Sequence, residues 1–109
     1  ATSTVANDVT EAAAFRNLFG DRLGSMTVSA HKSQIGHMMG GAGLAEAIVT
    51  VQILREGRIP PTLGHQELDP ACALDCVPGK PRSQEVSCAI TNSAGIGGNN
   101  ASVVLRAVS

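Results

Sequence analysis

The sequence has 109 residues, enough for one small domain with a modest core. Eight basic residues against nine acidic ones give a formal net charge of −1, which offers no electrostatic reason to expect nucleic acid or an anionic membrane as a partner. The longest apolar stretch, around 43–54, is interrupted by Glu46 and Gln52 and is too short and too polar to span a bilayer. No segment resembles a secretory signal, so we expect a cytoplasmic protein.

Three cysteines are an odd number for a disulfide framework, and no histidine or second cysteine pair completes a zinc pattern around Cys72 and Cys76. We therefore expect free thiols in a reducing compartment and no metal site. The chain has no Trp, no Tyr, two Phe and twelve Gly. This composition suits close packing of helices on a sheet, and it is equally typical of one portion of a larger core.

The first predicted element is a helix over 9–19. Asp8 and Glu11 have the spacing of a capping box, with Asp8 as the N-cap. Apolar residues then recur at helical spacing up to Phe19, and Gly20 follows as a plausible residue just beyond the helix end.

The middle of the chain predicts a strand, a helix and a long loop. Polar and apolar residues alternate over 26–30, which favours a short strand leading into the next motif. The run 43–57 is long enough for a helix and apolar almost all round, so we expect it to be buried on most sides. Prolines 60–61 favour extended backbone. Residues 63–83 indicate an ordered loop with one short strand near 73–77.

A closing β-hairpin is predicted at the end of the chain. Strands over 86–91 and 101–108 flank the segment NSAGIGGNN, whose three glycines permit positive φ angles. The order of elements indicates a mixed α/β fold, with a mixed sheet, a buried glycine-rich helix and the hairpin. No repeat or linker divides the chain, so 1–109 is predicted to be a single domain.

Protonatable groups gather in HKSQIGHMMGGAG, where the predicted strand gives way to the predicted helix. This junction is the usual location of sites in open α/β sheets, and a helix N-terminus favours developing negative charge. A neutral His37 donating a hydrogen bond to an oxyanion fits this place. Taken singly, a histidine such as His31 or His37 is more often a structural group than a catalytic one, and their combination with Lys32 narrows that difference.

Glu46 is the single charge in the apolar stretch between His37 and Arg55. An unpaired buried carboxylate costs several kcal/mol, on the order of 3–5, so Glu46 should be paired, protonated or on a solvated edge. Both alternatives stay open: Lys32 or a histidine of the preceding loop is a candidate partner, and Thr50 one turn further on permits a narrow polar strip.

Neither glycine cluster is a nucleotide-binding fingerprint. The segment GGAG lacks the lysine of a phosphate-binding loop, and no helix is expected after AGIGGNN. Close helix packing explains the first cluster better. The second offers backbone amides that can form an oxyanion nest.

Four segments, in order over essentially the whole chain, resemble β-ketoacyl-acyl-carrier-protein synthases. HKSQIGHMMGGAGLAEA resembles that family's Lys-Ser-x-x-Gly-His-x-x-Gly-x-Ala-Gly-x-x-Glu stretch. ATSTVANDVTEAAA, RIPPTLGHQELDPACALDCVP and TNSAGIGGNNASVVL are similar to its Thr-x-Thr, Pro-Pro-Thr and Gly-Gly-Thr-Asn-Ala-Ser segments. The resemblance implies the thiolase fold, with 1–109 a single partial domain from the later part of the C-terminal half.

The implied reaction is acyl transfer to a cysteine, followed by decarboxylative Claisen condensation with malonyl-carrier protein. By resemblance, His37 is the second catalytic histidine, and Lys32 is the family lysine that sets the electrostatics of the histidine pair. Glu46 is the buried acid near that lysine. The resemblance thus favours pairing over a solvated edge for Glu46.

The resemblance also implies binding residues. Thr2 and Thr4 match the threonines that hydrogen-bond the phosphopantetheine arm, and the backbone N–H of Ile96 matches an oxyanion-hole donor. His31 has no catalytic counterpart and is taken as structural.

Several family features have no counterpart here. The nucleophilic cysteine lies upstream in the family, and the first catalytic histidine would immediately precede Ala1. Val5 stands in place of the usual proline. Ala94 and Ile96 replace phenylalanines, and Asn99 replaces threonine, which puts gating of the acyl pocket in doubt.

The resemblance predicts an acyltransferase of fatty-acid or polyketide biosynthesis that is active only with the rest of the enzyme. No cofactor is expected beyond the phosphopantetheine that arrives on the acyl carrier protein. The expected partners are that carrier and the remainder of the ketosynthase, in a homodimer or heterodimer. Two alternatives stay open: a non-condensing partner subunit that resembles chain-length factors, and an inactive fragment.

Overall fold

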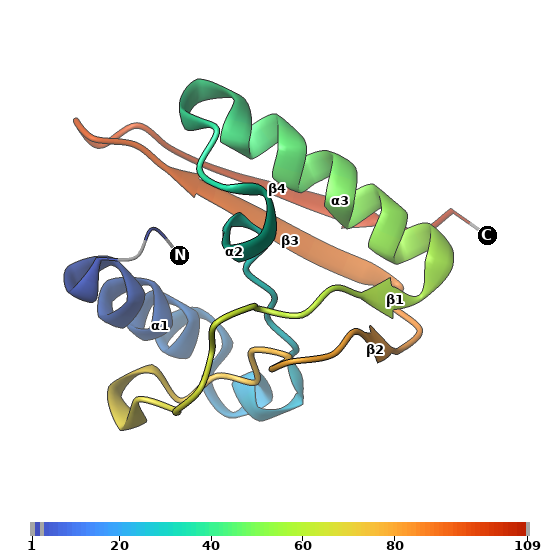
Figure 1. The fold of residues 1–109 in the computed structure, drawn as a ribbon, viewed down its shortest axis with the longest axis horizontal. Coiled ribbons are helices and arrows are strands. Elements are labelled where there is room, and N and C mark those ends of the chain that lie inside the picture. The colour runs from blue at the N-terminus through green and yellow to red at the C-terminus, as the bar shows by residue number, and fades with distance from the viewer. Residues whose placement is uncertain (1, 3, 109) are drawn as a thin grey trace. The chain divides into compact units, whose positions relative to one another are not determined.

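The computed structural model describes residue 2 and residues 4–108, and the chain divides into two compact units (Figure 1). The first unit comprises the chain up to Gly36 together with Pro60–Lys80. The second comprises His37–Ile59 and the chain from Pro81 onward. Each unit is described by itself below.

The first unit begins with helix α1 (Val5–Phe19), followed by the 3₁₀ segment η1 (Gly20–Ser25). The predicted helix is confirmed, but it begins four residues earlier and the predicted N-cap is wrong. Thr4 occupies the N-cap position, and the N–H of Asp8 donates to the Thr4 carbonyl oxygen at 3.5 Å. Asp8 thus lies in the first turn, where its negative charge favours the helix N-terminus.

The end of α1 is as predicted, and its buried side faces the core of the unit. Gly20 has a φ of 52°, and its N–H donates to the Arg16 carbonyl oxygen. Ala12 is fully buried, and the rings of Phe15 and Phe19 lie 6.2 Å apart between centroids.

The predicted strands over 26–30 and 73–77 are wrong. The two segments meet in one isolated parallel bridge, Thr27 with Asp75, next to the 3₁₀ segment η3 (Pro70–Cys72). A second isolated bridge joins Thr62 and Pro78. Proline lacks the N–H that a longer ladder requires, and side chains take over the bonding, as where Ser29 Oγ donates to the Pro60 carbonyl oxygen at 2.6 Å.

Short helix α2 (Lys32–Ile35) follows in the first unit and was not predicted. Ser33 Oγ donates to the Ala30 carbonyl oxygen at 2.8 Å and accepts from the Leu63 N–H at 2.9 Å. Gln34 Nε2 donates to the Pro61 carbonyl oxygen at 2.6 Å. These bonds tie the single turn of α2 to the proline segment of the same unit.

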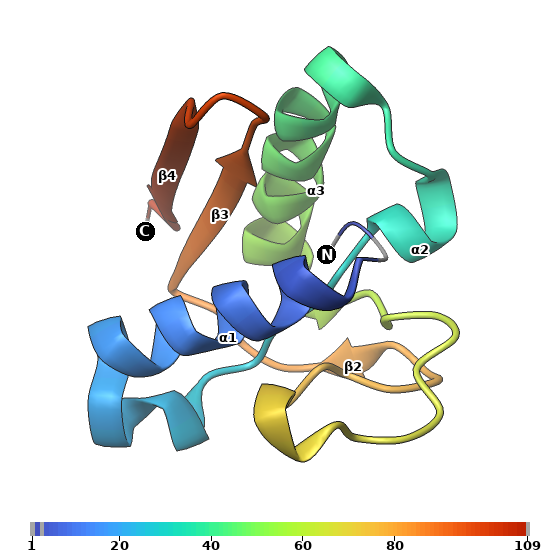
Figure 2. The same cartoon turned by 90° about the vertical axis from the view of Figure 1, so that its left-hand side faces the viewer.

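The second unit is a helix on a hairpin (Figure 2). The 3₁₀ segment η2 (Met39–Gly41) leads into α3 (Ala42–Glu56), which packs on strands β3 (Cys88–Ala94) and β4 (Asn100–Arg106). The strands pair antiparallel, from Cys88 with Arg106 to Ala94 with Asn100. The predicted hairpin and the predicted helix are both confirmed.

The expected mixed sheet is not what the described residues form. They form two separate antiparallel pairs, β3 with β4 and the very short β1 (Arg58–Ile59) with β2 (Arg82–Ser83). Pro60 follows β1 and Pro81 precedes β2, so missing N–H groups stop this ladder at two residues.

Helix α3 ends as predicted but is buried on one side only. Gly57 adopts the left-handed conformation (φ 60°) and donates its N–H to the Ile53 carbonyl oxygen at 2.9 Å. The buried residues are Ala42, Thr50 and Ile53. Large apolar residues on the same helix remain exposed, so the prediction of burial on most sides is wrong for this chain. In the part of the chain that the structure describes, no helix has the length and apolarity to cross a membrane.

Candidate functional site

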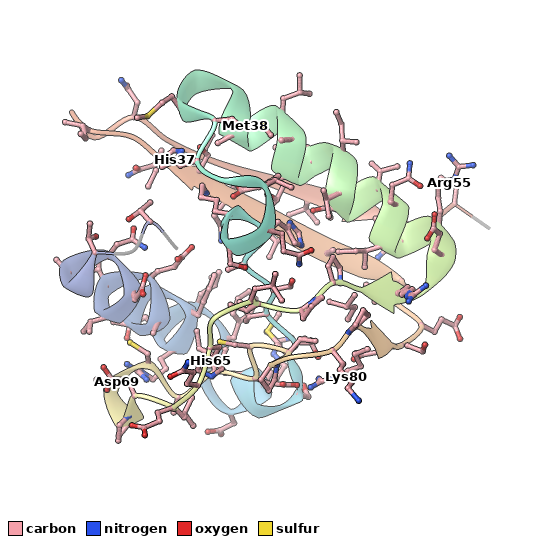
Figure 3. The ribbon with its side chains drawn as sticks, viewed as in Figure 1. His37, Met38, Arg55, His65, Asp69 and Lys80 are labelled. Atoms are coloured by element: carbon pink, nitrogen blue, oxygen red, sulfur yellow. The ribbon has the colours of Figure 1, made fainter. Side chains whose placement is uncertain are left out.

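His37 lies in the loop that leads into η2 and α3 (Figure 3). A backbone amide of the same loop determines which ring nitrogen carries the proton when the ring is neutral. The N–H of Met39 donates to His37 Nδ1 at 3.1 Å. An N–H can only donate, so Nδ1 must accept, and the proton of the neutral ring lies on Nε2. The side chain is exposed in this chain, so in the neutral ring Nε2–H can donate to an external acceptor.

The backbone that supplies this amide has an uncommon conformation. Met39 has a φ of 48°, which costs a non-glycine residue roughly 1–2 kcal/mol. The Gly41 N–H donates to the Met38 carbonyl oxygen at 2.9 Å and closes the turn just before α3 begins at Ala42. His37 is therefore attached through a tight turn to a long helix rather than to a flexible loop.

The β3–β4 turn forms a second group of backbone donors in the same unit. The N–H of Gly95 donates to the Asn99 carbonyl oxygen at 2.8 Å, and that of Gly98 to the Gly95 carbonyl oxygen at 3.2 Å. Gly97 and Gly98 have φ values of 97° and 84°, which only glycine adopts readily. Within residues 4–108, the N–H of Ile96 donates to no protein group, and its side chain is fully exposed.

The turn and the beginning of α3 lie at the same end of the second unit, as Figures 1 and 2 show. A Cβ placed on Gly43 would lie 3.5 Å from Ser93 Oγ, so the first turn of α3 touches the end of β3 closely. A Cβ at this position would make only an ordinary van der Waals contact, so the packing role of the first glycine cluster stays a prediction. A histidine donor and a backbone donor are thereby brought to one end of one unit.

Lys32 and Glu46 belong to different units. Lys32 is the first residue of α2 and is half-buried in the first unit. Glu46 is half-buried on α3 in the second unit, where its carbonyl oxygen accepts from Thr50 Oγ1 at 2.7 Å. Their pairing stays a prediction.

Thr2 and Thr4 are exposed, and their hydroxyl oxygens lie 3.3 Å apart within hydrogen-bond distance. Two adjacent hydroxyls can donate to and accept from an amide-containing arm. His31 is 8% exposed in the first unit.

The three cysteines are free thiols; Cys72 and Cys76 are half-buried and Cys88 is exposed. Burial raises the pKa of the Cys72 thiol, and the Asp69 carboxylate adds to the rise. Burial also raises the pKa of the Cys76 thiol, with Asp75 as the second cause. A raised pKa disfavours the thiolate, which is the nucleophilic form. Among the described residues, no group of three His, Cys, Asp or Glu side chains could hold a metal ion.

Met39 is the residue of the candidate site that sequence reasoning missed. Its contribution is a backbone N–H, which every residue except proline carries, and nothing in the letters predicts its φ of 48°.

Comparison with known proteins identifies the family. Residues 1–66 match the family described as Beta-ketoacyl synthase, C-terminal domain. The chain belongs to this family. Among curated ketoacyl synthases, 3-oxoacyl-[acyl-carrier-protein] synthase 2 of Synechocystis sp. is 43% identical over 105 residues, which cover 96% of this chain and 25% of that protein.

Solved ketosynthase structures share the fold. One described as the ishigamide ketosynthase/chain length factor superposes with a TM-score of 0.94 at 40% identity, over 99% of this chain and 26% of that one. A type II polyketide ketosynthase, described as in complex with its acyl-carrier protein, superposes with a TM-score of 0.95 at 29% identity, over 98% of this chain and 26% of that one. The chain thus spans about a quarter of the length of the ketosynthases it matches.

Proposed function

We propose that this chain supplies the second catalytic histidine and an oxyanion donor to a 3-oxoacyl-acyl-carrier-protein synthase. The hydrogen bond from the Met39 N–H to His37 Nδ1 carries the proposal, because it leaves His37 Nε2–H as a donor while the ring is neutral. The nucleophilic cysteine and the first catalytic histidine lie outside this chain.

In the proposed reaction, an acyl group passes from its carrier thioester to the cysteine of the complete enzyme. Malonyl-carrier protein then loses carbon dioxide, and negative charge develops on the thioester oxygen of the resulting enolate. His37 Nε2–H donates to that oxygen and stabilises the enolate. A neutral imidazole suits this role, since it donates a hydrogen bond without transferring a full proton.

The enolate carbon then attacks the acyl-cysteine carbonyl carbon. The tetrahedral oxyanion that forms accepts from the N–H of Ile96, whose amide has no protein acceptor within the described residues. The oxyanion collapses, the carbon–sulfur bond breaks, and cysteine leaves as thiolate. The product is 3-oxoacyl-carrier protein.

The remaining residues support this chemistry in the proposal. Lys32 pairs with Glu46, so the lysine charge stays fixed near the histidines and the half-buried carboxylate is compensated. Thr2 and Thr4 hydrogen-bond the phosphopantetheine arm of the acyl carrier protein. The carrier as a partner is supported by the related ketosynthase described in complex with its own carrier protein.

A non-condensing subunit is the second candidate. Ala94, Ile96 and Asn99 depart from the family's turn, and one matching structure is described as a ketosynthase/chain length factor. The presence of both Lys32 and His37 favours the condensing enzyme, because a subunit without chemistry has no need of a fixed imidazole tautomer.

The test uses Synechocystis synthase 2 in which this chain replaces the matching segment. We expect His37→Ala to lower malonyl decarboxylation on the order of 10²–10³-fold, the usual loss for one oxyanion donor. His65→Ala, in a loop of the first unit, is the matched control and should leave the rate unchanged. Decarboxylation by His37→Ala at the parent rate would refute the role of His37. The 109-residue chain alone should form no 3-oxoacyl product from acyl- and malonyl-carrier protein.

A further inference from the structure

Lys32 lies on a helix that is too short to hold its own position. Helix α2 is a single turn of four residues, and an isolated turn is unstable because nucleation of a helix is unfavourable. Contacts with other segments must therefore determine where Lys32 lies. The proposed function requires that place to be fixed, since the charge of the lysine acts on the histidines from there.

The contacts come from the proline segment of the same unit, residues 60–63. Each proline ring fixes its own φ and leaves its carbonyl oxygen available as an acceptor. Ser29 Oγ donates to the Pro60 carbonyl oxygen, and Gln34 Nε2 donates to the Pro61 carbonyl oxygen, both at 2.6 Å. The chain on both sides of the lysine is thus bonded to a conformationally restricted segment.

Thr62 closes a ring of hydrogen bonds just before the lysine. Thr62 Oγ1 accepts from the Ala30 N–H at 3.0 Å, and Ser33 Oγ donates to the Ala30 carbonyl oxygen at 2.8 Å. Ser33 Oγ also accepts at 2.9 Å from the N–H of Leu63, which follows Thr62 in the chain. Hydroxyl groups therefore fix both backbone polar groups of Ala30, two residues before Lys32.

Thr62 is itself anchored in the core of the first unit. Its N–H donates to the Val77 carbonyl oxygen at 2.9 Å, and Val77 is 1% exposed. The ring is therefore attached to a buried residue. We propose that Thr62 is a positioning residue for the ketosynthase reaction, whose hydroxyl holds the Ala30 peptide and, through it, Lys32. This inference rests on the proposed function for the role of Lys32.

The test measures malonyl decarboxylation by the hybrid Synechocystis synthase that carries this chain. Thr62→Val keeps the shape of the side chain but removes the acceptor of the half-buried Ala30 N–H. We expect this variant to lower the rate on the order of tenfold, since a displacement of about 1 Å can cost up to about 10²-fold. Thr62→Ser keeps the hydroxyl and should restore the rate to that of the parent.

Thr10→Val is the matched control. Thr10 is exposed on α1, and its hydroxyl donates to the Ala6 carbonyl oxygen of the same helix. The substitution therefore removes a threonine hydroxyl without touching the ring, and the rate should stay at that of the parent.

A double variant distinguishes positioning of the lysine from a general loss of structure. Lys32→Ala should lower the rate, and adding Thr62→Val to it should lower the rate no further, because Thr62 then has no lysine to position. A further loss by the full factor of the single Thr62→Val variant would overturn the proposal. A rate for Thr62→Ser as low as that for Thr62→Val would overturn it as well.

The same variants separate this inference from the proposed function. A low rate for Lys32→Ala together with the parent rate for Thr62→Val would overturn the inference and leave the proposed function standing. The parent rate for Lys32→Ala would overturn the proposed role of the lysine and the inference with it.

A second measurement requires no activity. Amide hydrogen exchange of the hybrid synthase, followed by mass spectrometry, reports the protection of residues 29–34. Exchange there should be faster in Thr62→Val than in the parent, and it should be unchanged in Thr62→Ser and in Thr10→Val. Unchanged exchange in Thr62→Val would show that the Thr62 hydroxyl does not hold this segment and would overturn the proposal.

Discussion

Helix α3 carries two isoleucines on opposite faces, and truncating each to alanine removes the same atoms from different surroundings. Ile53 is 8% exposed and Ile48 is 55% exposed. We expect Ile53→Ala to lower the free energy of unfolding of the free chain far more than Ile48→Ala does.

The expected sizes follow from burial. Truncation of a buried isoleucine costs about 2–5 kcal/mol, the lost transfer energy plus the cavity, and Ile53 belongs in this range at about 3 kcal/mol. Ile48 has lost only about half of its accessible surface, which corresponds to about 1 kcal/mol. Alanine is the better helix former by about 0.4 kcal/mol, which reduces the losses to about 2.6 kcal/mol for Ile53→Ala and about 0.6 kcal/mol for Ile48→Ala.

Urea unfolding of the two variants, followed by circular dichroism, measures the difference. The midpoint should fall clearly for Ile53→Ala and by little for Ile48→Ala, with similar slopes. Equal losses, or a greater loss for Ile48→Ala, would refute the assignment of the buried and exposed faces of α3.

Three further predictions concern the chain by itself. Gly57→Ala should lower the free energy of unfolding by about 1 kcal/mol, because Gly57 has a φ of 60° and a Cβ there would lie 3.4 Å from a carbonyl oxygen. A Cβ on Gly24 would meet nothing within 4 Å, so the control Gly24→Ala should be neutral in the same urea titration. Asp69→Ala should lower the free energy of unfolding by about 1 kcal/mol, because Asp69 Oδ1 accepts from a backbone N–H at 2.8 Å at the start of η3. Asp69→Asn keeps an oxygen acceptor and should lower it less. Equal losses in the two variants would contradict this. Because the pKa values of Cys72 and Cys76 are raised above the ordinary thiol value of 9.0, the unfolded chain releases these protons at a lower pH than the folded chain does. The free energy of unfolding should therefore fall as the pH rises above 9.0. A thermal midpoint that rises over that range would be inconsistent with the burial of these thiols.

Long local patterns were predictable from the sequence. The apolar run 43–57 predicted α3 and its end at Gly57, because the length of the run and a glycine that can adopt the left-handed conformation are both local features. The glycine-rich turn gave the β3–β4 hairpin in the same way. The start of α1 was wrong because helix formation continued past Asp8 to Thr4, where no side chain caps the helix.

Pairings between distant segments were not predictable. The β1–β2 ladder joins Arg58 with Ser83 across 25 positions and has only two residues on each side, so it leaves no periodic signal. The predictions of strands at 26–30 and 73–77 were wrong although the sequence alternates between polar and apolar residues at 26–30. The two segments pair through one isolated bridge, and side-chain hydrogen bonds stand where a longer backbone ladder was expected.

The candidate site was predictable in part. The motif around Lys32 and His37 identified which side chains to consider, and the resemblance assigned their roles. The donor to His37 Nδ1 is a main-chain group of Met39, whose position depends on the fold alone. The burial of α3 was overestimated because an apolar run predicts that a helix is buried but not on how many of its sides, and Leu44 and Ile48 of this helix are exposed.

The central claim is that His37 is held as an Nε2–H donor. Long-range ¹H–¹⁵N spectra of the ¹⁵N-labelled chain, at a mildly alkaline pH where imidazoles are neutral, report directly which ring nitrogen carries the proton. We predict a protonated Nε2 and an unprotonated Nδ1 for His37. His65 is the internal reference, because within residues 4–108 no backbone amide donates to its ring. A protonated Nδ1 on His37 would contradict the claim.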